Sequence, residues 1–189
     1  MTVIEMKPVR ERILDAATRS YYADGIRAVS ADRLIGEAHV SKATFYRYFP
    51  TKDHLIAAYL ELRSAAEMDA VTEQRKAHPG EPQAVLQWYA DLIGDVSCQP
   101  GFRGCPFINA AAELATSDHP ARTVIDEHRT WLTSQVAELL AEMGIEDAPS
   151  RAEQLMMLRD GAMILGYLGR TPQSVTTSLV DAGRAVIGH

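Results

Sequence analysis

Cysteine is scarce in this 189-residue chain, since Cys98 and Cys105 are the only two, and this excludes a small secreted domain built on many disulfides. No apolar run reaches the roughly 18–20 residues that a membrane-spanning helix needs, and the start of the chain, MTVIEMKPVRER, contains no apolar signal segment. Charged residues make up 23% and apolar residues 47%, which does not fit a disordered polyampholyte. We therefore expect a cytoplasmic globular protein without membrane contacts.

Motifs of common enzyme and metal sites are also missing. The chain has no Gly-rich phosphate loop after a strand and no Gly-x-Ser-x-Gly nucleophile motif. Its histidines form no His-x-x-x-His pair and no cluster with the cysteines, so we expect neither a metal nor another cofactor. A helical enzyme or small-molecule carrier is a distant alternative. The acidic residues with no apparent partner are interpreted as solvated surface charges: Glu113, Asp118, Asp126 and Glu127.

The two cysteines leave a redox function open. They flank the sequence QPGFRG, and Cys105 lies near an expected helix start with Arg103 nearby. Both features favour a thiolate, so DNA binding controlled by a disulfide is one interpretation. We favour the simpler interpretation, in which the thiols are unpaired and Cys105 packs as a small apolar residue.

The sequence is rich in helical periodicity. Apolar residues recur at i, i+3 and i+4 spacing, and β-branched residues form no alternating run. Ser30, Ser41 and Thr51 predict N-caps, and Gly25 predicts the end of the first helix. Ala23 is expected on the buried side of its helix, and so is Leu62. The pattern predicts an all-α protein with about nine helices, at 9–24, 31–38, 42–48, 52–78, 83–97, 104–116, 119–143, 149–169 and 172–187.

Basic residues are concentrated near the start of the chain. Residues 1–55 carry nine Lys and Arg against seven acids, whereas the remainder carries ten against eighteen. A polyanion is attracted to the first segment and repelled by the second. This asymmetry indicates where a nucleic acid would bind.

Two short helices separated by only His39 and Val40 predict a helix-turn-helix. In the second helix Phe45 is expected to point inward, as is Phe49 just after it, while the other side chains are polar or aromatic. Cationic heads and tyrosine hydroxyls reach phosphate oxygens, and threonine and ring faces meet base edges. The pattern predicts contact with double-stranded DNA through Lys42, Thr44, Tyr46, Arg47 and Tyr48.

Residues 13–60 resemble the TetR family of bacterial transcriptional regulators, most specifically in the run VSKATFYRYFPTKDHL. The resemblance implies a homodimer, usually a repressor, that leaves a palindromic operator when a small molecule binds. It implies a DNA-binding domain at 1–55 and a helical effector-binding and dimerisation domain at 56–189. The DNA contacts it implies are Ser30, Arg33, Lys42, Ala43, Thr44, Tyr46, Arg47, Tyr48 and Lys52.

Two residues depart from the family pattern. His39 and Ala43 stand where the family often has glycine. His39 occupies a turn where a positive φ is expected, which a residue with a Cβ adopts less easily. Ala43 adds a methyl group where the backbone approaches DNA. Both departures are expected to alter the preferred operator sequence.

Two helices near the C-terminus are apolar on two sides, and a helix of this kind must bury both of its apolar sides. A second copy of the chain can cover one of them. One recognition helix neutralises few phosphates, so a dimer that places two of them about 34 Å apart is also expected from DNA binding. The predicted dimer contacts are Leu155, Leu158, Ala162, Leu165, Leu179 and Val186.

The middle of the chain combines large apolar residues with few polar ones, which suits a pocket for a mostly hydrophobic effector. Core packing also explains any single one of these residues. An amide on an apolar face needs a partner, and this singles out Asn109 and Gln135. The predicted ligand site comprises Trp88, Tyr89, Leu92, Phe107, Asn109, His128, Trp131 and Gln135.

Overall fold

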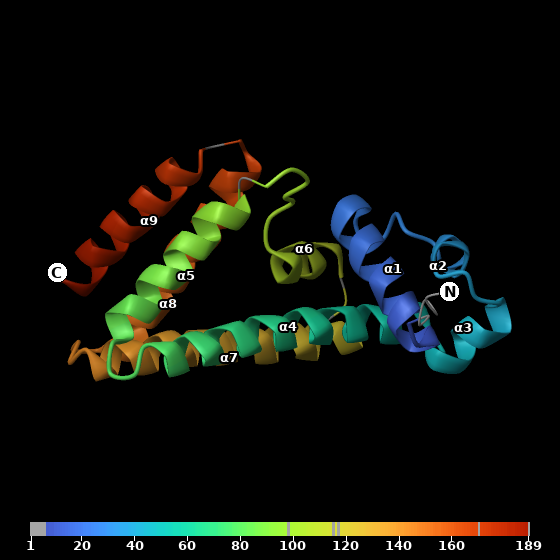
Figure 1. Cartoon of the computed structure of the whole chain (residues 1–189), viewed down its shortest axis with the longest axis horizontal. Coiled ribbons are helices and arrows are strands. Elements are labelled where there is room, and N and C mark those ends of the chain that lie inside the picture. Colours follow the sequence, from blue (N-terminus) through green and yellow to red (C-terminus); the bar gives the residue numbers. More distant parts are fainter. Residues whose placement is uncertain (1–6, 98, 115, 117, 170, 189) are drawn as a thin grey trace, which may run out of the picture. The chain divides into compact units, whose positions relative to one another are not determined.

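The computed structural model describes residues 7–97, 99–114, 116, 118–169 and 171–188. Over these residues it contains nine α-helices and no strand, which confirms the predicted all-α fold (Figure 1). The helices are α1 (Val9–Asp24), α2 (Ala31–Glu37), α3 (Lys42–Tyr48), α4 (Lys52–Ala77), α5 (Pro82–Ser97), α6 (Pro106–Glu113), α7 (Pro120–Glu142), α8 (Ala148–Tyr167) and α9 (Pro172–Ile187). The largest difference from prediction is α6, which begins at Pro106 rather than 104 because proline suits the first helical turn.

The chain divides into two compact units. The first contains the described residues up to Arg63 together with Pro106–Ile125, and the second contains Ser64–Cys105 and the residues from Asp126 onward. Helices α4 and α7 each begin in the first unit and continue into the second. The short helix α6 therefore belongs to the same unit as the helix-turn-helix.

The first unit is a small helical lobe with an aliphatic and aromatic core. Each predicted N-cap is confirmed, since Ser30 Oγ accepts from Arg33 N at 3.2 Å, Ser41 Oγ from Thr44 N at 3.1 Å, and Thr51 Oγ1 from His54 N at 3.3 Å. Fully buried residues of this lobe include Ile13, Ala16, Ala17, Val29, Leu34, Phe45, Leu55 and Leu60.

Two residues predicted to be buried in this lobe are exposed instead. Ala23 and Leu62 both lie on solvent-facing sides of their helices. Each is the last apolar residue of its predicted stripe, and α4 has buried residues beyond Leu62, at Ser64 and Val71. The prediction was wrong at these two positions because periodicity does not show which side of a helix its neighbours cover.

The turn of the helix-turn-helix has the expected backbone conformation. His39 has φ 52°, so the predicted positive φ at this non-glycine residue is confirmed. The Arg12 guanidinium donates to the His39 carbonyl oxygen at 3.4 Å, which ties the turn to α1. The turn therefore adopts a left-handed backbone conformation despite the imidazole side chain.

The second unit is built on contacts among α5, α8 and α9 (Figure 1). The part of α4 that belongs to this unit, from Ser64 onward, lies along α7. Ser64 Oγ is 3.0 Å from His128 Nδ1, and Arg75 pairs with Glu142 further along both helices. Its core between α7 and α8 contains Leu132, Val136, Leu140, Ala148, Ala152 and Met156.

Gly166 is the closest contact between α8 and α5. A Cβ at this position would lie 2.2 Å from Ser97 Cβ and 3.2 Å from Ser97 Cα, and Ser97 is itself buried. We expect Gly166→Ala to lower the free energy of unfolding by about 2–3 kcal/mol, because the two helices must separate. Urea unfolding followed by circular dichroism measures this change.

The control for this substitution is Gly36→Ala in α2. A Cβ at Gly36 meets nothing within 4 Å, so alanine is expected to raise stability by about 0.5–1 kcal/mol through helix propensity alone. Equal stability of Gly166→Ala and the unsubstituted chain would show that the α5–α8 contact is looser than described.

Candidate functional site

Helix α3 is anchored by one side and presents the other to solvent. Phe45 is fully buried and Phe49 nearly so, whereas Tyr46 and Tyr48 are 39% and 40% exposed. The Phe45 ring contacts the edge of Tyr46 at 5.3 Å between centroids, which holds the base of the exposed ring. The aromatic residues of α3 therefore divide between the core and the surface as the sequence predicted.

Basic side chains lie beside the exposed tyrosines. The Arg47 guanidinium stacks over the Tyr48 ring, 5.4 Å from its centroid. Lys42 Nζ lies 3.7 Å from Asp32 Oδ1, but both side chains are largely exposed, and such a pair contributes little. Lys42 is thus available to a phosphate, and the exposed surface of α3 combines Lys42, Ala43, Tyr46, Arg47 and Tyr48. We call these five residues the α3 face.

Arg33, a predicted DNA contact, is held within the lobe. Its guanidinium forms 2.7 Å ion pairs with Asp24 and with Glu37, and Ser20 Oγ also donates to Glu37 at 2.6 Å. The Ser20 hydrogen bond and the Arg33 pair hold the pKa of Glu37 below its ordinary value. Arg33 therefore braces α2 against α1, and a phosphate would have to compete with two carboxylates for it.

Lys52, also predicted to contact a phosphate, lies inside the lobe instead of on the α3 face. Its Nζ donates to the Ile26 carbonyl at 2.6 Å and lies 5.8 Å from the Tyr21 ring centroid. Burial lowers the pKa of this ammonium, and the nearby Glu113 and Asp53 only partly oppose the effect. The ammonium thus stabilises the turn between α1 and α2.

Glu113 has a positioning function that sequence reasoning missed. Its carboxylate accepts the backbone N–H groups of Ile26 and Arg27, at 3.1 and 2.8 Å. Glu113 is not the solvated surface charge predicted, because these contacts tie α6 to the turn after α1. No local pattern could have shown this contact, since the two segments are far apart in sequence.

The predicted ligand residues are divided between the two units. Phe107 and Asn109 lie on α6 in the first unit, where Asn109 borders a small void of about 10 Å³ beside three tyrosines. Gln135 donates to Glu138 at 3.1 Å on the surface of α7. The others belong to the second unit: Trp88, Tyr89, Leu92, His128 and Trp131.

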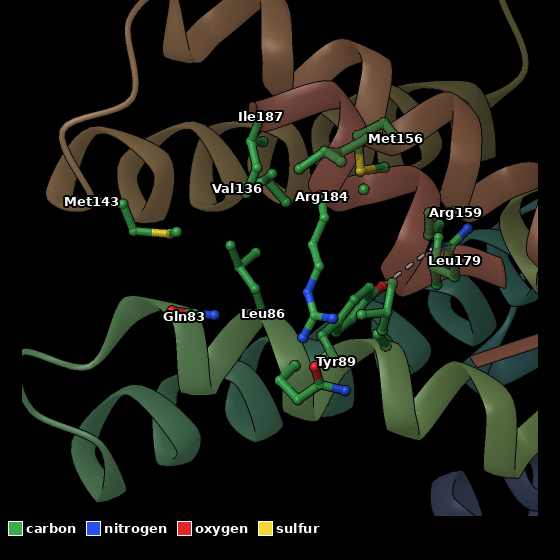
Figure 2. A pocket seen from close by; sticks show the side chains of 15 residues that line it. Gln83, Leu86, Tyr89, Val136, Met143, Met156, Arg159, Leu179, Arg184 and Ile187 are labelled. Carbon is green, nitrogen blue, oxygen red and sulfur yellow. Dashed lines mark hydrogen bonds between the residues drawn. The ribbon is translucent and has the colours of Figure 1, made fainter. Parts of the chain in front are cut away.

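The second unit contains a mostly apolar cavity of about 120 Å³ among α5, α7, α8 and α9 (Figure 2). Tyr89 is the one predicted ligand residue that lines it. Leu155 and Leu179, predicted as dimer contacts, also line it. The other lining residues are Gln83, Leu86, Gln87, Ala90, Val136, Met143, Met156, Arg159, Val180, Gly183, Arg184 and Ile187.

A buried polar cluster adjoins this cavity. The Tyr89 hydroxyl donates to Glu67 Oε1 at 2.5 Å, and His128 Nε2 lies 3.3 Å from Glu67 Oε2. Arg159 pairs with Asp160 at 3.0 Å and lies 3.9 Å from Glu67 Oε1. We call Glu67, Tyr89, His128, Arg129, Arg159 and Asp160 the buried cluster; Arg129 joins it through two hydrogen bonds to Asp160, at 2.8 and 2.7 Å.

Charge in the buried cluster is balanced. Two guanidinium groups face two carboxylates when His128 is neutral. Burial alone would raise the pKa of Glu67, but His128, Arg159 and Tyr89 outweigh it and hold the pKa below the ordinary value. Burial, in contrast, raises the pKa of the Tyr89 phenol. Glu67 therefore stays ionised and Tyr89 neutral. An arginine within the apolar helix α8 is the sequence signal that could have revealed this cluster.

Glu67→Gln is expected to lower the free energy of unfolding by about 3 kcal/mol at neutral pH, because the buried Arg159 loses a counter-charge. The pKa of Glu67 is lower in the folded than in the unfolded chain. Its contribution is therefore complete above the ordinary glutamate pKa of about 4.3 and is lost as pH falls through the folded-state pKa. Urea unfolding at a series of pH values measures the difference between the two proteins.

Glu153→Gln removes the same charge from an exposed position on α8 and is expected to change stability little at any pH. A Glu67→Gln deficit that stays constant down to acid unfolding would contradict the assigned pKa shift.

One side of α8 and the residue after it form an exposed apolar patch. Met157 and Leu168 are 68% and 69% exposed; Ile164 and Leu165, at 52% and 40%, follow Met157 by about two helical turns and precede Leu168 by about one. Contiguous exposed apolar surface of this kind marks an interaction site. We call Met157, Ile164, Leu165 and Leu168 the α8 patch.

Only one predicted dimer contact lies in the α8 patch, namely Leu165. Ala162 is buried within the chain, and Leu158 and Val186 are half-buried. Sequence periodicity detected two apolar sides of α8 but did not show which of them packs against the chain itself.

The remaining predictions concern cysteines, metals and membranes. Cys105 is buried, and Cys98 lies outside the described residues. Among the residues that the structure describes, no group of three or more His, Cys, Asp or Glu side chains could hold a metal ion. No helix in the described ranges has the length and apolar character to cross a membrane.

Taken together, the capped two-helix motif and the α3 face define a helix-turn-helix protein that contacts DNA. Known proteins agree with this class. The family described as bacterial regulatory proteins, tetR family, matches residues 13–59. A solved TetR-family transcriptional regulator from Streptomyces coelicolor is 40% identical with a TM-score of 0.85, over 95% of this chain and 94% of that one. The chain belongs to the TetR family of DNA-binding transcriptional regulators.

Other relatives share less of the chain or less identity. The HTH-type transcriptional repressor KstR of Mycobacterium tuberculosis is 38% identical over 134 residues, which are 70% of this chain and 58% of KstR. The reduced form of Escherichia coli NemR has the same fold, with a TM-score of 0.81 at 20% identity over 95% of this chain and 97% of that one.

Proposed function

We propose that this regulator is a repressor that binds a palindromic operator as a homodimer and leaves it when a mostly hydrophobic small molecule binds. The observation that carries the proposal is the α3 face. Tyr46 and Tyr48 are 39% and 40% exposed and lie with Lys42 and Arg47 on the solvent side of α3, a combination that matches the chemistry of phosphates and base edges. Residues 1–55 would then bind the operator, and the remainder would bind the effector and the second subunit.

The α3 face supplies the direct DNA contacts in this proposal. Thr44 lies at its edge, half-buried, and its hydroxyl accepts a hydrogen bond from Ser41. The other predicted contacts, Ser30, Arg33 and Lys52, are given a supporting function, since each already bonds within the lobe. They would hold α2 and the start of α4 where backbone N–H groups meet phosphates.

We assign the contact with the second subunit to the α8 patch. Four large apolar side chains on one side of a helix are costly to leave in water, and an identical patch related by a two-fold axis covers them. A dimer also presents two copies of α3, whereas a monomer presents one. Two copies can contact two half-sites that lie about one turn of the DNA helix apart.

The response to a small molecule is assigned to the cavity in the second unit. Tyr89 and Arg159 line this cavity and also contact Glu67, which is on α4. Helix α4 begins at Lys52, shortly after α3 ends. A ligand that displaces Tyr89 or Arg159 thus changes contacts of the helix that follows α3. It releases DNA only if it prefers the conformer that binds DNA poorly.

Selection of bound genomic fragments, followed by footprinting, tests the proposal. We expect two protected half-sites related by a two-fold axis, one dimer per site, and an affinity that falls steeply with salt. A single protected half-site or binding without salt dependence would contradict it. Release of the selected fragment by a small apolar compound tests the effector response separately.

A further inference from the structure

The cavity in the second unit has one charged side chain, Arg184, that no described residue of the chain neutralises. Arg184 projects from α9 across the cavity toward α5 (Figure 2). Within the described part of the chain, no carboxylate pairs with its guanidinium and no acceptor receives its hydrogen bonds. Its neighbours Leu86, Leu179 and Ile187 are aliphatic, so its five N–H groups are free for a ligand.

The second arginine of the cavity is already compensated. Arg159 pairs with Asp160 and faces Glu67, and the buried cluster as a whole carries no net charge. Within the described part of the chain, a ligand therefore meets one unpaired positive charge, at Arg184, in a mostly apolar lining whose other polar side chains are Gln83, Gln87, Tyr89 and Arg159. An uncharged ligand would leave that charge unpaired beside its apolar body, whereas an anion would neutralise it.

The position of Arg184 keeps the desolvation cost of pairing with an anion low. Its side chain is exposed to solvent, so the cation is not buried, and the anionic group of a ligand stays partly hydrated when the two meet. A guanidinium presents a planar pair of donors that matches the two oxygens of a carboxylate. The recognised group is thus a carboxylate at the mouth of the cavity.

The volume of the cavity limits the apolar part of the ligand. About 120 Å³ is somewhat less than the roughly 150 Å³ of a cavity known to hold benzene. Methionines 143 and 156 line the wall, and their flexible side chains can yield slightly to a guest. A body of about one six-membered ring therefore matches the volume of the cavity.

We propose that the effector is a small carboxylate whose apolar body is about one ring in size, with its carboxylate bound by Arg184. The inference deepens the proposed effector response and rests on it for its biological meaning. Binding of the carboxylate can be measured without DNA, so this inference and the proposed function can be refuted separately.

Calorimetric titration of the full chain with three carboxylates tests this inference: benzoate, phenylacetate and cyclohexanecarboxylate, each compared with its primary amide. We expect at least one acid to bind roughly tenfold more tightly than its amide, since a hydrogen bond to a charged partner is worth more than one to a neutral group. Arg184→Gln is expected to abolish this preference and Arg184→Lys to restore part of it. Arg63→Gln, which removes an equal charge from an exposed site on α4, is expected to keep it.

Each outcome decides the inference. Equal binding of acid and amide, an unchanged preference in Arg184→Gln, or no binding by any of the acids would overturn it. Operator binding without any ligand is measured in parallel. A chain that binds DNA but ignores the carboxylates refutes this inference alone, whereas a chain that prefers acids through Arg184 but binds no DNA refutes the proposed function alone.

Discussion

Tyr46→Ala is expected to reduce operator affinity by roughly a hundredfold or more while leaving the fold intact. One lost contact to a base edge or phosphate costs about 1–3 kcal/mol, and a dimer loses two. The Tyr46 ring is 39% exposed, and alanine favours a helix, so stability should change little. Fluorescence anisotropy with the selected fragment measures the affinity, and thermal unfolding measures the stability.

Phe45, the residue before Tyr46, serves as the comparison, because its substitution is expected to affect stability. Phe45 is fully buried, and Phe45→Ala is expected to cost about 3–5 kcal/mol of stability through the cavity it leaves. Unchanged DNA affinity in Tyr46→Ala, with stability preserved, would refute the assignment of the α3 face to DNA.

Leu165→Glu is expected to convert the dimer to a monomer and, through it, to weaken operator binding by roughly a thousandfold. The two-fold axis of the proposed interface brings each new carboxylate close to its own copy, and burying a charge without a partner is costly. Light scattering during gel filtration measures the mass, and anisotropy measures the DNA affinity.

The matched control is Leu62→Glu. Leu62 on α4 and Leu165 on α8 are almost equally exposed, at 44% and 40%, but Leu62 lies outside the α8 patch. The control is expected to remain dimeric. A Leu165→Glu protein that is still dimeric would place the interface elsewhere on the chain.

The proposed response to a ligand depends on the same helix that carries the dimer patch. Helix α8 places Arg159 and Met156 toward the cavity and Met157 and Ile164 toward solvent. In the proposed dimer, a ligand that shifts Arg159 would act on a helix that the second subunit also contacts. Ligand binding and dimer geometry would then be linked through α8, and the affinity of the dimer is expected to change with ligand occupancy.

Most features of the first lobe could be predicted from residues that are close together in the sequence. Hydroxyl side chains placed before α2, α3 and α4 cap those helices, and the i, i+4 spacing of Phe45 and Phe49 divides the surface of α3 from its core side. These interactions join residues within one helical turn, so residue order alone shows them. The positive φ of His39 could likewise be predicted, because the resemblance places this residue where the family often has glycine.

The effector site was beyond sequence reasoning because it joins segments distant in the chain. Asn109 was singled out for its polarity, yet α6 belongs to the unit of the helix-turn-helix, and Gln135 bonds to Glu138 on its own helix. Arg184 was not singled out from the sequence. Only the crossing of α5, α8 and α9 turns it toward an apolar cavity.

Residue order by itself determined the all-α architecture, the helix caps and the exposed tyrosines and cations of α3, since each depends on neighbours within a few positions. The tertiary structure decided which side of α8 is buried, where the cavity lies, and that Glu113 and Lys52 secure the turn at Ile26. The physical reason is that periodicity shows that a helix side is apolar, whereas the element that covers it is chosen by packing among helices distant in sequence.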